Sequence, residues 1–302
     1  MNNLFPLFSN NILPIFLTAG TGWLIGRFTN IDIRTIARIA FYIFSPALIF
    51  QLITNNYVPG NEFARMAGLA IAVTAVLSTL EWTIGKLVGL HRRMLAAVLL
   101  VSIFPNAGNY GLSAVLLARG ETGLALASIY FVTMATITYT VGVVIASMGK
   151  KSFVDSAKGL LKIPVLYALA GAYMFNLFHW ALPVPLKSSI ELLSQAAIPT
   201  MLLLLGLQLQ RAVWKQDLLA LGIANGLRLV VSPIVAIGLG LAIGISGLSL
   251  QVGVLQAAMP SAVMTIILAT EFQVEPEFVT TAVATSTLLS PLTLTPLMAF
   301  LG

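Results

Sequence analysis

Two prolines interrupt long apolar stretches of this chain, one in each half of the sequence. Pro105 lies in the segment FPNAGNYG (104–111) and Pro260 in the segment QAAMPSAVMT (256–265), so both have small and polar neighbours. A proline inside a helix lacks the backbone N–H and clashes with the carbonyl group one turn back, so each stretch should break into two half-helices. In a bilayer, lipid cannot satisfy the backbone groups that such a break frees. Broken helices are therefore expected only where protein or a polar cavity surrounds them.

The composition places these stretches in a membrane. The mean hydropathy is +0.97, 58% of the residues are hydrophobic and 9% are charged, which is far outside the range of soluble globular domains. A membrane span needs about 20 apolar residues. Polar interruptions divide the chain into ten such spans: 11–28, 35–54, 64–88, 94–118, 122–148, 159–180, 186–209, 217–244, 250–270 and 277–301. We therefore predict an all-α membrane protein with no sizeable soluble domain, whose first span is retained and not cleaved as a signal peptide.

The basic residues predict how the spans are oriented. Twelve of them lie in the links after spans 1, 3, 5 and 7, and three (Arg65, Arg119 and Lys187) lie on the other side. Because loops rich in Lys and Arg stay in the cytoplasm, both termini of this cell (inner) membrane protein are expected to be non-cytoplasmic. The net charge of +6 then indicates topology, not nucleic-acid binding. The twelve residues are Arg27, Arg34, Arg38, Lys86, Arg92, Arg93, Lys150, Lys151, Lys158, Lys162, Arg211 and Lys215.

The spacing of the prolines predicts an internal duplication. Three proline pairs are separated by 150, 153 and 155 residues: Pro14 with Pro164, Pro46 with Pro199, and Pro105 with Pro260. Five spans per unit is an odd number, so the second unit enters the membrane from the opposite side and the units form a 5+5 inverted repeat. The discontinuous spans 4 and 9 would then cross halfway through the bilayer. Unrelated proline kinks, which are common in membrane helices, are the alternative interpretation.

The expected crossover carries residues suited to an anion. A helix N-terminus presents free N–H groups and about half a positive charge, and second half-helices that begin near Asn106 and Ser261 would bring two such ends together. We predict a site for the carboxylate of a small organic anion, with Pro105 and Pro260 as hinges. Helix capping is the alternative role for the asparagines and the serine. The predicted binding residues are Asn106, Asn109, Tyr110, Ser261 and Thr265.

Few charged residues lie deep inside the spans. Arg228 is the only basic residue deep within one, and we expect it to neutralise the carbonyl ends of the first half-helices rather than to touch the substrate. Gln256, one turn before Pro260, is expected to form a structural hydrogen bond across the crossover. Glu81 is the deepest acid, and beside Trp82 we interpret it as an interfacial anchor. Without an intramembrane carboxylate for coupling, a uniporter driven by the membrane potential is favoured, with a sodium- or proton-coupled symporter as the alternative.

With these residues in view, the chain resembles the auxin efflux carrier family, which comprises the plant auxin exporters and bacterial relatives, some of them linked to dicarboxylates such as malonate. The most specific segment is QAAMPSAVMTIILATEFQVEPEFVTTAVATSTLLSPLTL (256–294). Pro105-Asn106, the run IPTMLLLLGLQL (198–209), and Arg228 with Ser232-Pro233 support the resemblance. The plant exporters have a Pro-Gln pattern at the second break, whereas this chain has Pro260-Ser261. This departure from the family pattern argues against an auxin-like substrate.

The resemblance implies a fold similar to that of bile-acid/sodium symporters and sodium/proton antiporters, in which a transport part moves against a scaffold in an elevator mechanism. Mapped onto this chain, residues 1–62 and 150–212 would be scaffold, and residues 63–149 and 213–302 would be the transport part. The resemblance further implies substrate contact at Asn106 and a homodimer formed through scaffold helices.

Other classes of function lack their parts in this sequence. There is no cysteine, and His91 and His179 lie near helix ends. Neither a His-Glu-x-x-His metal motif nor a Gly-x-Ser-x-Gly elbow occurs, so we predict no enzyme activity, no metal and no other cofactor. A non-transporting ligand sensor on a carrier fold remains the alternative from another class. The expected partners are a small organic anion, membrane lipid and a second copy of the chain.

Overall fold

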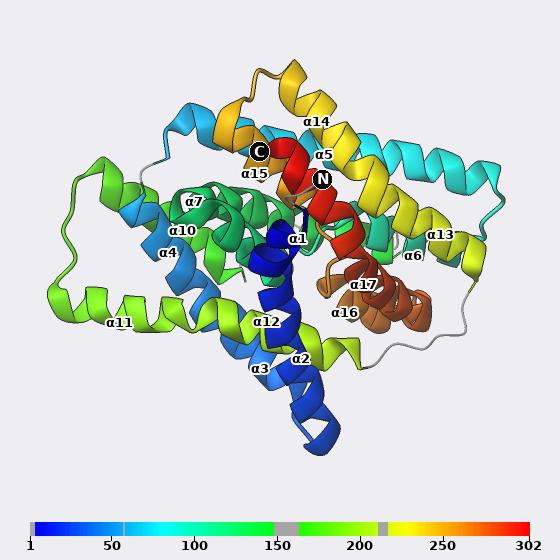
Figure 1. The fold of residues 1–302 in the computed structure, drawn as a ribbon, viewed down its shortest axis with the longest axis horizontal. Coiled ribbons are helices and arrows are strands. Elements are labelled where there is room, and N and C mark those ends of the chain that lie inside the picture. Colours follow the sequence, from blue (N-terminus) through cyan, green and yellow to red (C-terminus); the bar gives the residue numbers. More distant parts are fainter. Residues whose placement is uncertain (1–3, 57, 148–162, 211–216) are drawn as a thin grey trace.

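The computed structural model describes residues 4–56, 58–147, 163–210 and 217–302. Across these residues the regular elements are helices, and η marks a π-helical turn (Figure 1). The first half contains α1 (Leu4–Leu7), η1 (Phe8–Ile12), α2 (Leu13–Phe28), α3 (Ile33–Ile39), η2 (Ala40–Phe44), α4 (Ser45–Asn55), α5 (Gly60–Leu87), α6 (Arg92–Ile103), η3 (Ala107–Leu112), α7 (Ser113–Ile137), η4 (Thr138–Gly142) and α8 (Val143–Ala146). The second half contains α10 (Pro164–Leu177), α11 (Val184–Gln195), α12 (Ala197–Leu209), α13 (Leu218–Gly226), η6 (Leu227–Val231), α14 (Ser232–Ala242), α15 (Gly247–Ala257), α16 (Met264–Phe272) and α17 (Pro276–Leu301).

The helices overlap the predicted spans without matching them one to one. Seven continuous helical segments in the described part of the chain are long and apolar enough to cross a membrane. One of them, Ala107–Ala146, joins the end of predicted span 4 to span 5. The two are separated by a kink at Gly120, whose φ of 66° is accessible to glycine at little cost. The shorter helices α6, α15 and α16 are the pieces of the two stretches that contain Pro105 and Pro260.

Both of these stretches are interrupted at the proline. The helix stops between α6 and η3 around Pro105, and between α15 and α16 around Pro260. The N–H of Asn106 donates to the carbonyl of Pro260 (2.7 Å), and the N–H of Ala262 donates to the carbonyl of Phe104 (2.8 Å). These two bonds pair the breaks as a short antiparallel bridge, so each break satisfies backbone groups that the other one frees. The helix after Pro260 begins at Met264, three residues beyond the Ser261 start that the sequence suggests.

Helices α2 and α12 touch through their backbones. A Cβ atom on Gly206 would lie 1.7 Å from the carbonyl oxygen of Ala19, and one on Gly22 would lie 2.2 Å from the carbonyl oxygen of Leu203. Glycine at both places lets the helices approach this closely, as is common between membrane helices. In Figure 1, α2 crosses α12, and α4 lies beside α10. The amide of Asn176 on α10 donates to the carbonyl of Ile53 on α4 (2.6 Å).

Some sequence predictions fall outside the described residues. They are the start of the sixth span before Ile163, the domain boundaries near 149 and 212, and six of the basic residues used to predict orientation: Lys150, Lys151, Lys158, Lys162, Arg211 and Lys215.

Candidate binding site at the paired helix breaks

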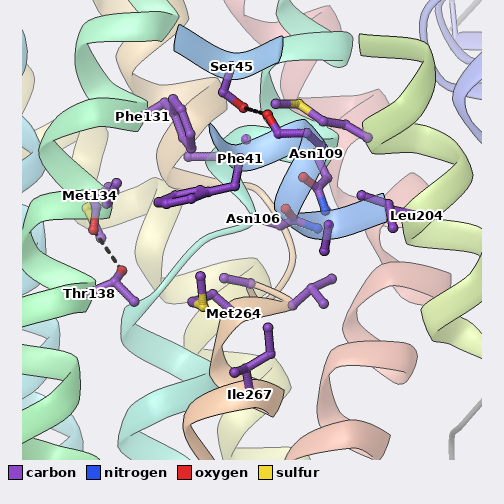
Figure 2. A pocket seen from close by; sticks show the side chains of 18 of the residues that line it. Phe41, Ser45, Asn106, Asn109, Phe131, Met134, Thr138, Leu204, Met264 and Ile267 are labelled. Atoms are coloured by element: carbon purple, nitrogen blue, oxygen red, sulfur yellow. Dashed lines mark hydrogen bonds between the residues drawn. The ribbon is translucent and has the colours of Figure 1, made fainter. Parts of the chain in front are cut away.

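A cavity of about 140 Å³ lies against the paired breaks. One water molecule needs roughly 10–15 Å³ by the same measure, so the cavity has room for a small organic molecule. Its walls come from α3, η2, the start of α4 and α12 on one side, and from both breaks, η3, α7, η4 and the start of α16 on the other (Figure 2). The lining residues are Ala37, Ala40, Phe41, Ser45, Pro105, Asn106, Ala107, Gly108, Asn109, Phe131, Met134, Ala135, Thr138, Tyr139, Met201, Leu204, Gln208, Ala262, Val263, Met264 and Ile267.

Two of the predicted binding residues, Asn106 and Asn109, line this cavity. Their side chains lie next to each other in Figure 2, between Leu204 and Phe41. Asn106 is 4% exposed, and its Nδ2 has no hydrogen-bond partner. It occupies the N-cap position of η3 but makes no capping hydrogen bond. The capping alternative therefore leaves its amide unexplained, and a buried unpaired donor faces the cavity.

The other three predicted binding residues do not line the cavity. Ser261 is buried, and its N–H donates to Oγ of Ser286 (3.1 Å). The hydroxyl of Thr265 donates back to the carbonyl of Ala262 (2.6 Å). Tyr110 is fully buried, with its ring edge-on to Phe16 at 6.2 Å between centroids and its hydroxyl accepting a hydrogen bond from Ser290 (3.1 Å). In this structure, then, the polar contribution to the cavity from the two breaks comes from the first break.

The cavity has polar side chains in its wall but no charged ones. None of its lining residues carries a charged side chain. The helical segment that starts at η3 begins at the cavity wall, and the first N–H groups of a helix lack acceptors within it. Such a start carries positive partial charge. The cavity thus offers amide donors and a positive helix end without any lysine or arginine.

Sequence reasoning missed most of the cavity wall. Phe41, Phe131 and Thr138 lie on elements far from the prolines in the chain. Gln208 on α12 also lines the cavity, with its Oε1 buried and without a partner. One local signal lies in the backbone, because the π-helical turns η2, η3 and η4 all border the cavity, and such turns are frequent at functional sites.

Arg228 lies on η6 at the opposite side of the breaks, with 1% of its surface exposed. Its Nη1 donates to the carbonyls of Ser102 (2.8 Å) and Ile103 (3.0 Å) at the end of α6. Its Nη2 donates to the carbonyl of Ala257, at the end of α15, and to the hydroxyl of Ser232. The guanidinium therefore covers the carbonyl ends of both first half-helices, where the helix dipole is negative.

Gln256 does not form the hydrogen bond expected of it. It is fully buried, and neither Oε1 nor Nε2 has a partner. Its side chain lies against Gly111, where a Cβ atom would come within 2.3 Å of Oε1. The missing Cβ of Gly111 is what lets this side chain reach across from α15 to η3.

The interpretation of Glu81 as an interfacial anchor is wrong. Glu81 is 1% exposed, whereas its neighbour Trp82 is 54% exposed. The two residues lie on different faces of α5, and Glu81 belongs to the stripe that faces the protein interior. Adjacent positions on a helix do not share a face.

The fold and the site define the class of this protein, a multi-pass helical membrane protein with a cavity at two paired helix breaks. The family described as membrane transport protein matches residues 7–298, nearly the whole chain. The chain belongs to this family, which includes the auxin efflux carriers, and its members are transporters and not enzymes.

Individual relatives agree with this assignment. A Methanothermobacter thermautotrophicus protein named an uncharacterized transporter is 28% identical over 262 residues, which is 86% of each chain. A Rhizobium meliloti protein whose name proposes malonate transport is 24% identical over 301 residues, 95% of this chain and 93% of its own. Auxin efflux carrier component 3a of Oryza sativa subsp. japonica is 30% identical over 132 residues, 43% of this chain and 21% of its own.

Proposed function

We propose that this protein is a secondary carrier that moves a small organic anion across the membrane by elevator-type alternating access. The observation that carries the proposal is the amide of Asn106, buried and unpaired, at the wall of an uncharged cavity beside the paired breaks. An amide donor and free N–H groups at a helix start suit the oxygens of a carboxylate. Because no fixed cation lines the cavity, an anion is held by donors that release it without breaking an ion pair.

A ten-span inverted repeat with crossing spans 4 and 9 is part of this proposal. Helix contacts support it, because they come in pairs that an exchange of the two halves would interchange. The contact of α2 with α12 has its counterpart in that of α10 with α4, and the contact of α5 with α6 in that of α14 with α15. The contact of α15 with α7 likewise corresponds to that of α6 with α17. Unrelated proline kinks would not require such a correspondence.

The position of the cavity supports the proposed elevator motion. One wall belongs to the proposed scaffold (α3, η2 and α12) and the other to the proposed transport part (η3, α7 and α16). Movement of one part against the other would carry an anion bound at Asn106 and expose it to the opposite side. Arg228, by binding both breaks, would keep them together during the movement. A homodimer through scaffold helices and non-cytoplasmic termini complete the proposal.

The substrate is proposed to be a carboxylate with few atoms. The cavity volume of about 140 Å³ sets the size, and the name of the Rhizobium meliloti relative makes malonate the first compound to test. Among the lining residues, Asn106, Asn109, Gln208, Ser45, Thr138 and Tyr139 provide the polar side-chain atoms.

The test is malonate binding and flux with the purified protein in proteoliposomes, together with an Asn106→Asp variant. The variant keeps the shape of the side chain and replaces the donor with a negative charge. We expect saturable malonate flux in the parent and at least a 30-fold weaker affinity in the variant, about 2 kcal/mol for losing a hydrogen bond to a charged group.

Asn225→Ala is the matched control. Asn225 is a partly buried asparagine whose amide donates to Thr285 (2.9 Å) away from the cavity, so this variant should keep the parent affinity. Saturable binding without flux would favour a sensor over a carrier. Equal affinity of the parent and Asn106→Asp would overturn the anion assignment.

A further inference from the structure

Glu81 is a buried carboxyl group without any partner. It lies on the interior stripe of α5 together with Thr74, Leu77 and Gly85, and 1% of it is exposed. Neither of its carboxylate oxygens has a hydrogen-bond partner. An ionised carboxylate without hydrogen bonds is costly inside a protein, whereas a neutral carboxylic acid is far less so. Side chains on a helix lean toward its N-terminus, so the carboxyl group of Glu81 points away from the exposed end at Leu87 and deeper into the protein.

Arg228 is the charged group that acts electrostatically on Glu81. The two are not joined, because the oxygens of Glu81 and the Nε of Arg228 all lack partners, while both Nη atoms are committed to the carbonyl ends of the half-helices. Tyr130 on α7 is a further buried titratable group on a helix packed against α5. Among the described residues, α14 and α15 have no titratable side chain. The charged residues of the other helices around Glu81 lie near helix ends or at a kink. On α6, Arg92 and Arg93 lie at its exposed start, and on α7, Arg119 and Glu121 flank the kink at Gly120. On α5 itself, Glu62 and Arg65 lie near one end and Lys86 near the other.

We propose that Glu81 is a proton-binding site whose protonation is coupled to anion binding. In the state described here, Glu81 holds the proton, and on losing it the carboxylate turns to the free Nε of Arg228. A metal cation fits less well, because Arg228 repels it and the described residues contain no group of three or more His, Cys, Asp or Glu that could hold an ion. A proton needs no such set of ligands.

The coupling rests on the proposed function and on the position of Arg228. With Glu81 protonated, no carboxylate offsets the charge of the guanidinium, which favours an anion near the breaks. With Glu81 ionised, that charge is cancelled. Binding of the anion and binding of the proton therefore strengthen each other by the same factor. Glu81 is six residues from the end of α5, so a proton taken from the water at that end has to travel about 9 Å along the helix axis.

The first measurement is malonate accumulation in proteoliposomes with the membrane potential clamped at zero and an inward tenfold proton gradient. One proton per anion predicts up to about tenfold accumulation by the parent. Glu81→Gln, which mimics the protonated acid, should exchange malonate without accumulating it. Glu62→Gln is the control on the same helix, since Glu62 is only partly buried and accepts a hydrogen bond from Ser249 (3.3 Å); it should accumulate malonate like the parent.

The second measurement reads the proton directly and needs no anion. Exposed acids are ionised at pH 7, so the infrared band of a protonated carboxylic acid in the parent at pH 7, absent in Glu81→Gln, would establish the proton site. A pH titration of this band in the parent alone serves if the variant does not fold. If this band is absent from the parent, the inference about Glu81 is overturned, but the proposed transport function is not affected. A band without malonate flux contradicts the proposed function for malonate and leaves the proton site standing; a band with flux that ignores the gradient overturns the coupling.

Discussion

The two sides of the paired helix breaks solve the same electrostatic problem in different ways. On one side, the first half-helices end, and their carbonyls of Ser102, Ile103 and Ala257 receive hydrogen bonds from Arg228. On the other side, the helical segment after the first break begins beside a cavity without charged side chains, where the amide of Asn106 has no partner. Helix ends carry opposite partial charges, so the first side needs a cation and the second an anion. The cation is built into the chain, and the anion is left to a ligand.

This difference explains how two broken helices can remain stable inside a membrane. The permanent arginine stabilises the negative ends whether or not a ligand is present. The backbone bonds of Asn106 to Pro260 and of Ala262 to Phe104 hold the breaks together from within. Exchange of a ligand on the cavity side then does not remove the interactions that keep the half-helices in place. The permanent contacts of Arg228 therefore allow a ligand to bind and leave on the cavity side.

Removal of Arg228 should have the largest effect of any change on either side. Arg228→Ala leaves the buried carbonyls of both first half-helices without donors, and we expect a loss on the order of 3–5 kcal/mol of stability. Thermal unfolding of the purified protein in detergent measures this loss. Arg228→Lys should recover only part of it, because one ammonium group cannot span the carbonyls that the planar guanidinium reaches. An Arg228→Ala protein that unfolds at the same temperature as the parent would contradict this structural role.

Gln256 lies between the two sides and offers a smaller test. Its buried amide has no partner, so Gln256→Met removes unpaired polar atoms at similar volume, and stability should hold or rise by about 1 kcal/mol. Malonate flux should fall several-fold if the amide finds its partners in another state of the transport cycle. Gln251→Met on the same helix is the contrast, since Gln251 donates to the carbonyl of Leu301 (2.8 Å) and its loss should lower stability. A clear loss of stability in Gln256→Met would show that the amide is already paired.

The sequence was sufficient to predict two kinds of feature: helix breaks that proline itself causes, and residues that are rare inside an apolar span. Proline breaks a helix through its own ring and missing N–H, so the interruptions at Pro105 and Pro260 could be predicted locally. Arg228 stood out because a cation inside an apolar span is costly and needs a partner. The apolar stretches were visible from composition, and in the described part of the chain seven helical segments are long and apolar enough to cross a membrane.

The rest depended on contacts between distant segments. Whether Tyr110 faces the cavity depends on the π-helical turn η3, because such a turn changes the face of the helix on which each residue lies. No residue type predicts a π-helical turn from the sequence. Phe41, Phe131 and Gln208 reach the cavity from helices far along the chain. Glu81 was misjudged because the exposed Trp82 beside it suggested an interface, although the two residues lie on different faces of α5.

Tyr110→Phe should have the smallest effect, and it tests how sharply the cavity side is bounded. The hydroxyl of Tyr110 contacts Ser290 inside the protein and not the cavity, so its loss should lower stability by about 1 kcal/mol and leave malonate affinity within about twofold. Tyr139→Phe is the matched comparison, because Tyr139 does line the cavity. A tenfold loss of affinity in Tyr110→Phe, about 1.4 kcal/mol, would mean that this hydroxyl reaches the ligand in another state. The cavity would then extend past the wall formed by Asn106 and Asn109, and the polar side chains that the two breaks contribute would no longer be confined to those two amides.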